Sequence, residues 1–210
     1  MAIHSPSGPP LSEPVPPPGD RRLVVSFHDL APHTQRPCQE LLMLLAEIGV
    51  PRASLFVAPP VEGAGPILER PFFLRWLRAL AEEGHEIRLE AVNGAGEERM
   101  LAEAGLPPRG VEYALAPGYL YLPREGARIA ISTIAFSTRG LLGRAVSPLA
   151  GRARFAASRR RSVLRVAVHP GDLYEHRVRQ ALVSVLQRAV ADREPVTYGE
   201  LARAAAPSQV

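Results

Sequence analysis

Three places along the chain put ionisable side chains directly behind a short apolar run. They are His28 with Asp29 after residues 23–27, Glu90 after residues 86–89, and His169 after residues 163–168. Imidazole and carboxylate groups are the side chains that most often transfer protons in catalysis and bind divalent metal ions. Singly, Asp29 could cap a turn and His169 could bond to a loop, but a placement that recurs three times favours a shared site.

The apolar runs in front of these residues are typical of buried strands in a parallel sheet. Strands at 23–27, 53–57, 86–89, 111–115, 127–136 and 163–168 alternate with helical patterns at 38–48, 71–83, 97–104 and 178–186. This alternation predicts an α/β fold, either a barrel or a doubly wound sheet. Catalytic groups of such folds lie past the carboxyl ends of the strands, so we expect Asp29, Glu90 and His169 to converge on one mouth.

Two local patterns define the second and the last helix more closely. After Pro71, the spacing of the apolar residues predicts one buried face made of Phe72, Phe73, Trp76, Leu77 and Leu80. Near the end of the chain, Thr197 and Glu200 have the spacing of a capping box and predict the start of a terminal helix.

Composition indicates one globular domain behind a proline-rich tail. Of the 210 residues, 46% are hydrophobic and 22% are charged, which is ordinary for a folded domain and leads us to expect one over residues 21–205. Residues 1–20 hold seven of the prolines and predict a disordered tail, with docking to a partner domain as the alternative. No signal sequence or apolar run of membrane-spanning length is visible, so we expect a soluble, cytoplasmic protein without a membrane partner.

The charge pattern does not favour nucleic-acid binding. The formal net charge is +4, and every basic residue is an arginine. Only residues 159–161 form a basic run, and no aromatic residues are interleaved with it, so we interpret it as a solvated face or an anion-binding loop. Cys38 is the single cysteine, which excludes a disulfide within the chain, and we interpret it as a bystander.

The segment Val-Ser-Phe-His-Asp-Leu-Ala-Pro at 25–32 resembles the first motif of the polysaccharide deacetylase (NodB-like) superfamily. The resemblance is to a divergent, uncharacterised branch in which a His-Asp pair replaces the usual Asp-Asp. It continues in order through Gly-Val-Pro at 49–51, Gly-His-Glu-Ile at 84–87, Ala-Pro-Gly at 116–118 and Val-His-Pro at 168–170. It extends over nearly all of residues 22–203.

This resemblance implies a distorted (β/α) barrel with fewer strands than a complete one, and the removal of acyl groups from amino sugars with a divalent metal, zinc or similar. The carbohydrate or another acylated small molecule would be the ligand. By position, His28 stands where the catalytic base is found and His169 matches the acid that protonates the leaving group. The metal ligands would be Asp29 and Glu90, and the substrate wall would include Ala116, Pro117 and Asp172.

The sequence departs from the family where the metal should bind. The family's His-x-x-x-His motif falls on Glu-Ala-Val-Asn-Gly at 90–94, so both histidine ligands are absent. A catalytic zinc usually has three protein ligands, whereas Asp29 and Glu90 offer two hard oxygens, which suit weak magnesium-like binding or none. The chain between Gly94 and Ala116 is also short for the family, which predicts a truncated or open barrel.

Three functions therefore remain open at this point. The chain could be a deacetylase-like protein with weakened or lost activity that still binds a carbohydrate or acylated ligand. It could be a working metal-dependent deacylase with a site rebuilt from Asp29, Glu90 and a histidine. It could also be a structural or partner-binding α/β domain without hydrolytic chemistry.

The tail provides the first test. Proline-rich chain buries little apolar area, so deletion of residues 1–20 should leave the melting temperature within a few degrees of that of the full chain. Thermal unfolding followed by circular dichroism measures this directly. A large drop in melting temperature would show that the tail is docked on the domain.

Overall fold

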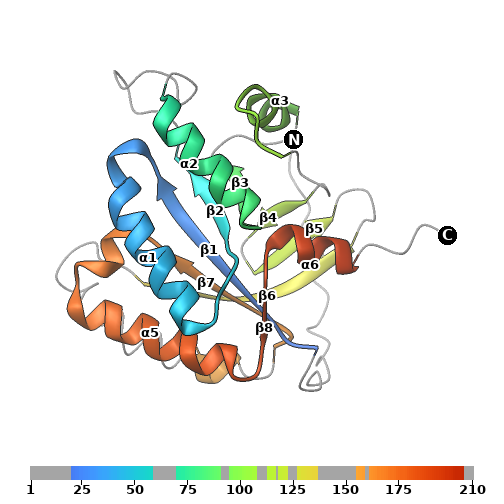
Figure 1. Ribbon diagram of the computed structural model, residues 1–210. Coiled ribbons are helices and arrows are strands. Elements are labelled where there is room, and N and C mark those ends of the chain that lie inside the picture. The colour runs from blue at the N-terminus through green and yellow to red at the C-terminus, as the bar shows by residue number, and fades with distance from the viewer. Residues whose placement is uncertain are drawn as a thin grey trace, which may run out of the picture.

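A curled sheet in the form of a half-barrel lies at the centre of the computed structural model (Figure 1). The structure describes residues 20–58, 70–90, 95–107, 113–116, 118–122, 127–136, 155–158 and 161–205. The predicted tail, Asp20 excepted, and residues 159 and 160 of the basic run at 159–161 lie outside these residues. The α/β class predicted from the sequence is confirmed.

The strand order of the sheet is β3-β2-β1-β7-β6-β5-β4, with β8 paired to β1 beside this path. β1 pairs in parallel with β2, β7 and β8, β2 pairs in parallel with β3, and β6 pairs in parallel with β7. The strands are β1 (Arg22–Leu30), β2 (Ser54–Val57), β3 (Glu86–Leu89), β4 (Ala114–Ala116), β5 (Tyr119–Leu122), β6 (Ala127–Ala135), β7 (Val163–Val168) and β8 (Glu194–Val196).

The half-barrel differs from a fully parallel sheet at one edge. β4, β5 and β6 pair antiparallel, and β5 was not predicted. β4–β5 and β5–β6 are joined by short connections, so the chain reverses its direction twice between β4 and β6. The predicted strand at 127–136 is β6, and the one at 111–115 is displaced to β4.

Helices cover the convex face of the sheet and one end of its concave face (Figure 1). α1 (Gln35–Ile48) begins three residues earlier than predicted and ends at Gly49, whose φ of 99° favours glycine. In α2 (Pro71–Glu82), Phe73 and Leu77 are buried as predicted, but Phe72 is 77% exposed and does not belong to that face. The other helices are α3 (Ala95–Glu103), α5 (His176–Val190) and α6 (Tyr198–Ala205), with 3-10 turns η1 (Pro32–Thr34) and η3 (Pro170–Leu173).

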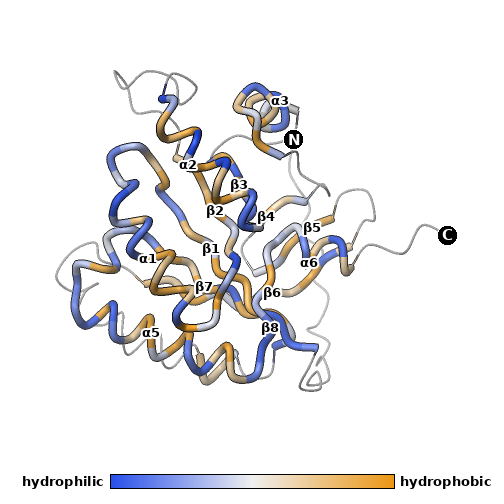
Figure 2. The backbone as a smooth tube through the Cα atoms, in the orientation of Figure 1, coloured by the Kyte–Doolittle hydropathy of each residue, from blue (hydrophilic) through white to orange (hydrophobic). Residues whose placement is uncertain are grey.

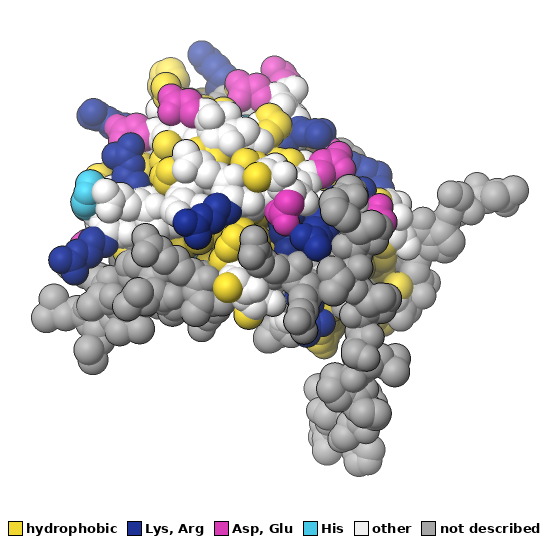
Figure 3. All heavy atoms as spheres, turned by 90° about the horizontal axis from the view of Figure 1, so that it is seen from below, with side chains coloured by type: hydrophobic (Ala, Val, Ile, Leu, Met, Phe, Trp, Pro, Cys, Tyr) yellow, Lys and Arg dark blue, Asp and Glu magenta, His cyan; other side chains and the backbone are white. Residues whose placement is uncertain are grey.

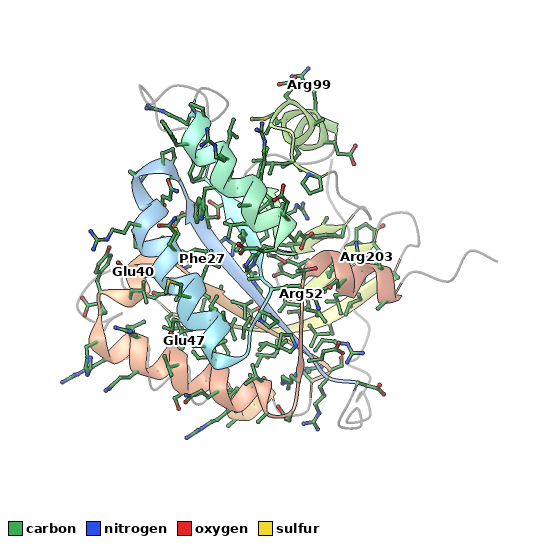
Figure 4. All side chains as sticks on the ribbon, viewed as in Figure 1. Phe27, Glu40, Glu47, Arg52, Arg99 and Arg203 are labelled. Atoms are coloured by element: carbon green, nitrogen blue, oxygen red, sulfur yellow. The ribbon has the colours of Figure 1, made fainter. Side chains whose placement is uncertain are left out.

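Alternation along β1 divides the core into two parts. Leu23, Val25 and Phe27 face the helices, and Figure 4 shows Phe27 between β1 and α1. Val24 and Ser26 face the concave side. Hydrophobic residues gather where the central strands cross beneath α1 and α5 (Figure 2). Two-residue periodicity thus gives this strand one apolar face and one face that also carries polar groups.

α6 closes the concave side at the amino-terminal ends of the strands. Its predicted capping box is confirmed, because the backbone N–H of Thr197 donates to Glu200 Oε2 at 2.8 Å and that of Glu200 donates to Thr197 Oγ1 at 3.2 Å. Tyr198, fully buried, packs its ring against Phe56 and Tyr113 with centroid separations of 6.2 and 5.7 Å.

The carboxylate of Glu86 joins the two open edges of the half-barrel to α6. Its Oε1 accepts a hydrogen bond from Tyr113 Oη at 2.6 Å, across the gap between β3 and β4. Its Oε2 accepts from Ser54 Oγ at 2.6 Å and from the backbone N–H of Gly199 at 3.2 Å. Arg88 lies over the Tyr113 ring, 4.3 Å from its centroid. One side chain therefore ties β2, β3, α6 and the start of β4 together.

We predict that Glu86→Leu lowers the free energy of unfolding by about 3 kcal/mol or more, because it leaves three donors without their acceptor in a largely buried setting. Chemical denaturation gives this value. Glu82→Leu, at an exposed position on α2, is the matched control and should stay within about 0.5 kcal/mol of the wild type. Equal stability of the two variants would show that Glu86 does not hold the edges together.

Candidate functional site

A bulge at the end of β1 positions the first predicted site residue. The pairing of β1 with β2 shifts between Phe27 and Leu30, and Asp29 has a φ of 59°. Phe27 and Leu30 consequently both reach the helix-side core, while His28 turns to the concave face. β1 is longer than predicted, so His28 and Asp29 lie within the strand and not behind it. Bulges of this kind often redirect a side chain beside a functional site.

His28 is held at both ring nitrogens. Its Nδ1 lies 2.7 Å from Glu90 Oε1, and its Nε2 lies 2.9 Å from Arg165 Nη2 and 3.1 Å from Ser26 Oγ. Arg165 Nε also donates to Ser26 Oγ at 2.9 Å. We call the carboxyl-terminal strand ends with His28, Glu90, Arg165 and His169 the mouth of the half-barrel.

These contacts define which nitrogen of His28 carries the proton. A guanidinium can only donate, so Nε2 must accept and the proton resides on Nδ1, from which it is donated to Glu90. The imidazole is then neutral, with the cation Arg165 on one side and the anion Glu90 on the other. Neither nitrogen retains a lone pair for a metal ion or for a substrate proton.

A row of rings crosses the mouth. His28 stacks on Phe56 with centroids 4.6 Å apart and planes at 10°, and on His169 with centroids 5.4 Å apart and planes at 26°. The side chain of His169 is 37% exposed, against 17% for His28 and 23% for Glu90. Of the three residues predicted to converge, Glu90 and His169 both contact His28, whereas Asp29 is exposed.

Asp172 is a buried carboxyl group that binds the backbone of His169. Its Oδ2 accepts the backbone N–H of His169 at 2.9 Å and lies 3.9 Å from Nδ1 of the same residue, too far for a hydrogen bond. The Asp172 side chain is only 1% exposed, and burial raises its pKa from 3.8 to about 6 against the opposing effect of the His169 N–H. It was predicted to contact the substrate, but this burial excludes direct contact and leaves it a supporting role.

The residues predicted to hold a metal do not suit one. Asp29 is exposed, and it takes no part in the contacts that join Glu90 and His169 to His28. Within the same residues no group of three or more histidine, cysteine, aspartate or glutamate side chains gathers at metal-binding distance. A divalent cation at Glu90 and His28 would also have to displace the hydrogen bond between them and approach the guanidinium of Arg165. In this arrangement the donor set does not fit zinc or magnesium.

The wall predicted on the other side of the mouth is described only in part. Ala116 ends β4, which runs in the same direction as β3, and Pro117 lies outside the described residues. Since Tyr113 contacts Glu86 at the start of β3, the end of β4 extends toward the level of Glu90. This placement is consistent with the predicted wall, and a substrate role for Ala116 stays a prediction.

Ser26 and Arg165 belong to the site although sequence reasoning did not select them. The sequence could have indicated both, because each is a polar residue at an inward position of an otherwise apolar strand. Glu86, Arg88 and Glu90 show the same two-residue spacing along β3. Cys38, in contrast, is buried with its pKa raised to about 11 by desolvation, which agrees with an inert thiol.

Comparison with known proteins adds no relative, since no protein-family model and no curated protein matches the chain. The resemblance to the polysaccharide deacetylases therefore rests on the motifs alone. None of the helices in the described ranges is long and apolar enough to cross a membrane. On the face seen in Figure 3, arginine side chains are spread among acidic ones and do not form a single basic patch.

The buried carboxyl group makes stability depend on pH. Because the pKa of Asp172 is higher in the folded than in the unfolded chain, its stabilising contribution is complete below about pH 4 and is lost as the pH rises through about 6. Asp172→Asn keeps an acceptor for the His169 N–H without the charge. The difference in free energy of unfolding between this variant and the wild type should therefore increase, in favour of the variant, by about 3 kcal/mol as the pH rises from about 4 to about 7. Parallel pH profiles of the two proteins in urea unfolding would contradict this.

Proposed function

We propose that this protein is a deacetylase-like domain without hydrolytic activity that binds a carbohydrate or an acylated small molecule at the mouth of its half-barrel. The observation that carries the proposal is the double engagement of His28, whose two nitrogens are bonded to Glu90 on one side and to Arg165 and Ser26 on the other. His28 stands at the position of the family's catalytic base, but here its hydrogen bonds connect the strands of the mouth.

The chemistry left to this site is too weak for amide hydrolysis. Without a metal, general acid–base catalysis contributes about 10²–10⁴-fold, whereas hydrolytic enzymes accelerate their reactions by many more orders of magnitude. His169 is exposed enough to donate a proton, but its partner as base would be a His28 ring with no free lone pair. A histidine without a competent base, metal or activated water can bind an acyl group more readily than it can cleave one.

The groups at the mouth suit binding of a polar ring. His169, whose side chain is 37% exposed, stacks on His28, and Glu90 offers carboxylate oxygens at a partly exposed position. Planar side chains with an apolar face and a polar edge, combined with a few charged groups, are common in ligand sites. The order of the motifs along the chain adds the expectation of a carbohydrate or acyl ligand.

The binding proposal is tested with N-acetylated chitotetraose as the probe. The purified chain should bind this tetrasaccharide in calorimetry without releasing acetate, and should contain well under one zinc ion per chain by elemental analysis. His169→Ala should weaken binding by about tenfold, because it removes the more exposed of the two stacked histidine rings. His176→Ala, at an exposed position at the start of α5, is the matched control and should bind like the wild type.

The other outcomes separate the remaining functions. One zinc per chain together with acetate release would establish a working deacylase with a rebuilt site and overturn the proposal. No binding of the tetrasaccharide by folded protein would count against a carbohydrate site and favour the partner-binding function.

A further inference from the structure

The side chain of Arg165 occupies an unusual position for an arginine. It lies in the middle of β7, half-buried, opposite Val24 of β1, on the concave face of the sheet. From there it extends along the strand to Ser26 and His28, with donor–acceptor distances of 2.9 Å to each. Both partners are uncharged, so the nearest groups do not neutralise the guanidinium.

Most of the hydrogen-bonding capacity of Arg165 is not used within the described part of the chain. A guanidinium carries five N–H groups in a planar fork, and Arg165 uses one on Ser26 and one on His28. No carboxylate among the described residues forms an ion pair with it. Arg193, which is 4% exposed, instead donates to the carbonyl oxygens of Ser158, Arg161 and Ser162. Three of the five N–H groups of Arg165 are thus unused within the described part of the chain.

The ring of His28 lies between Arg165 and the carboxylate of Glu90. Glu90 binds Nδ1 and Arg165 binds Nε2, which lie on opposite sides of the imidazole. An anion on the Arg165 side is therefore separated from Glu90 by a neutral ring, and it would meet the partly exposed His169 next to it. The charge arrangement favours an anion on one side of His28 only.

We propose that the mouth is a receptor for an oxyanion, a carboxylate or phosphate group carried by the ligand, with Arg165 as its anchor. The inference rests on the proposed binding function and adds the charge of the ligand to it. A fixed guanidinium takes the place of a divalent cation here, and it differs from a metal in its chemistry. It binds two oxygens of a planar or tetrahedral anion through parallel N–H groups and activates no water.

The experiment compares two sugars that differ only at one carbon, D-glucuronate and D-glucose. Ligand-observed NMR at low salt should show glucuronate binding about tenfold or more tightly than glucose, because a charge-assisted hydrogen bond is stronger than a neutral one. Added salt should reduce this preference. Glucose 6-phosphate serves as the phosphate arm, and tighter binding of either anionic sugar supports the inference.

Variants attribute the preference to Arg165. Arg165→Gln should abolish it, since the amide nitrogen takes the place of Nε, which donates to Ser26, but has no charge. Arg165→Lys keeps the charge without the fork and should retain part of the preference. Arg75→Gln is the matched control, because Arg75 is exposed on α2 and lies over the Phe72 ring. Thermal unfolding of each variant establishes that it is folded.

Failure of this inference is distinguishable from failure of the proposed function. If chitotetraose binds but glucuronate, glucose 6-phosphate and glucose do so equally or not at all, the oxyanion inference is wrong and the binding function stands. If Arg165→Gln is folded and keeps the full preference, Arg165 is not the anchor. If chitotetraose does not bind but an anionic sugar does, the carbohydrate specificity proposed above is wrong and Arg165 still anchors an anion.

Discussion

The concave face of this sheet must hold ionised side chains away from bulk water, and supplying each of them with hydrogen-bond partners is the constraint on which the rest of the structure depends. Moving a charge out of water costs several kcal/mol unless hydrogen bonds replace its hydration. Glu86 meets this requirement with Ser54, Tyr113 and Gly199, and Arg88, which is 4% exposed, lies over the Tyr113 ring. Because these partners come from different elements, satisfying the charges also determines how the half-barrel curls.

The same requirement shapes the mouth. Glu90 and Arg165 are too far apart to neutralise each other directly, and the neutral ring of His28 connects them. A ring that bridges a cation and an anion is strongly oriented, and it presents one flat face to Phe56 and the other to His169. The arrangement that stabilises the mouth is thus the one that withdraws His28 from proton transfer and metal binding.

A binding function agrees both with the motifs that resemble the deacetylases and with the geometry of the mouth. Under our proposals, the guanidinium of Arg165 supplies the positive charge that a metal ion supplies in the family whose motifs the chain resembles. The proposed site would recognise oxygen atoms and would not activate water. The bulge at Asp29 is the local device that orients His28 toward this site.

The sequence by itself determined the α/β class, most of the helices and strands, and the placement of Glu90 and His169 at one end of the sheet. These features depend on short-range periodicity and on strands that point their carboxyl ends the same way. The antiparallel hairpins, the bulge that extends β1, and the exposure of Phe72 depended on long-range pairing and were not visible in local patterns. Only the tertiary structure decided that Arg165 reaches His28, since residues 137 positions apart meet through the neighbouring strands that carry them.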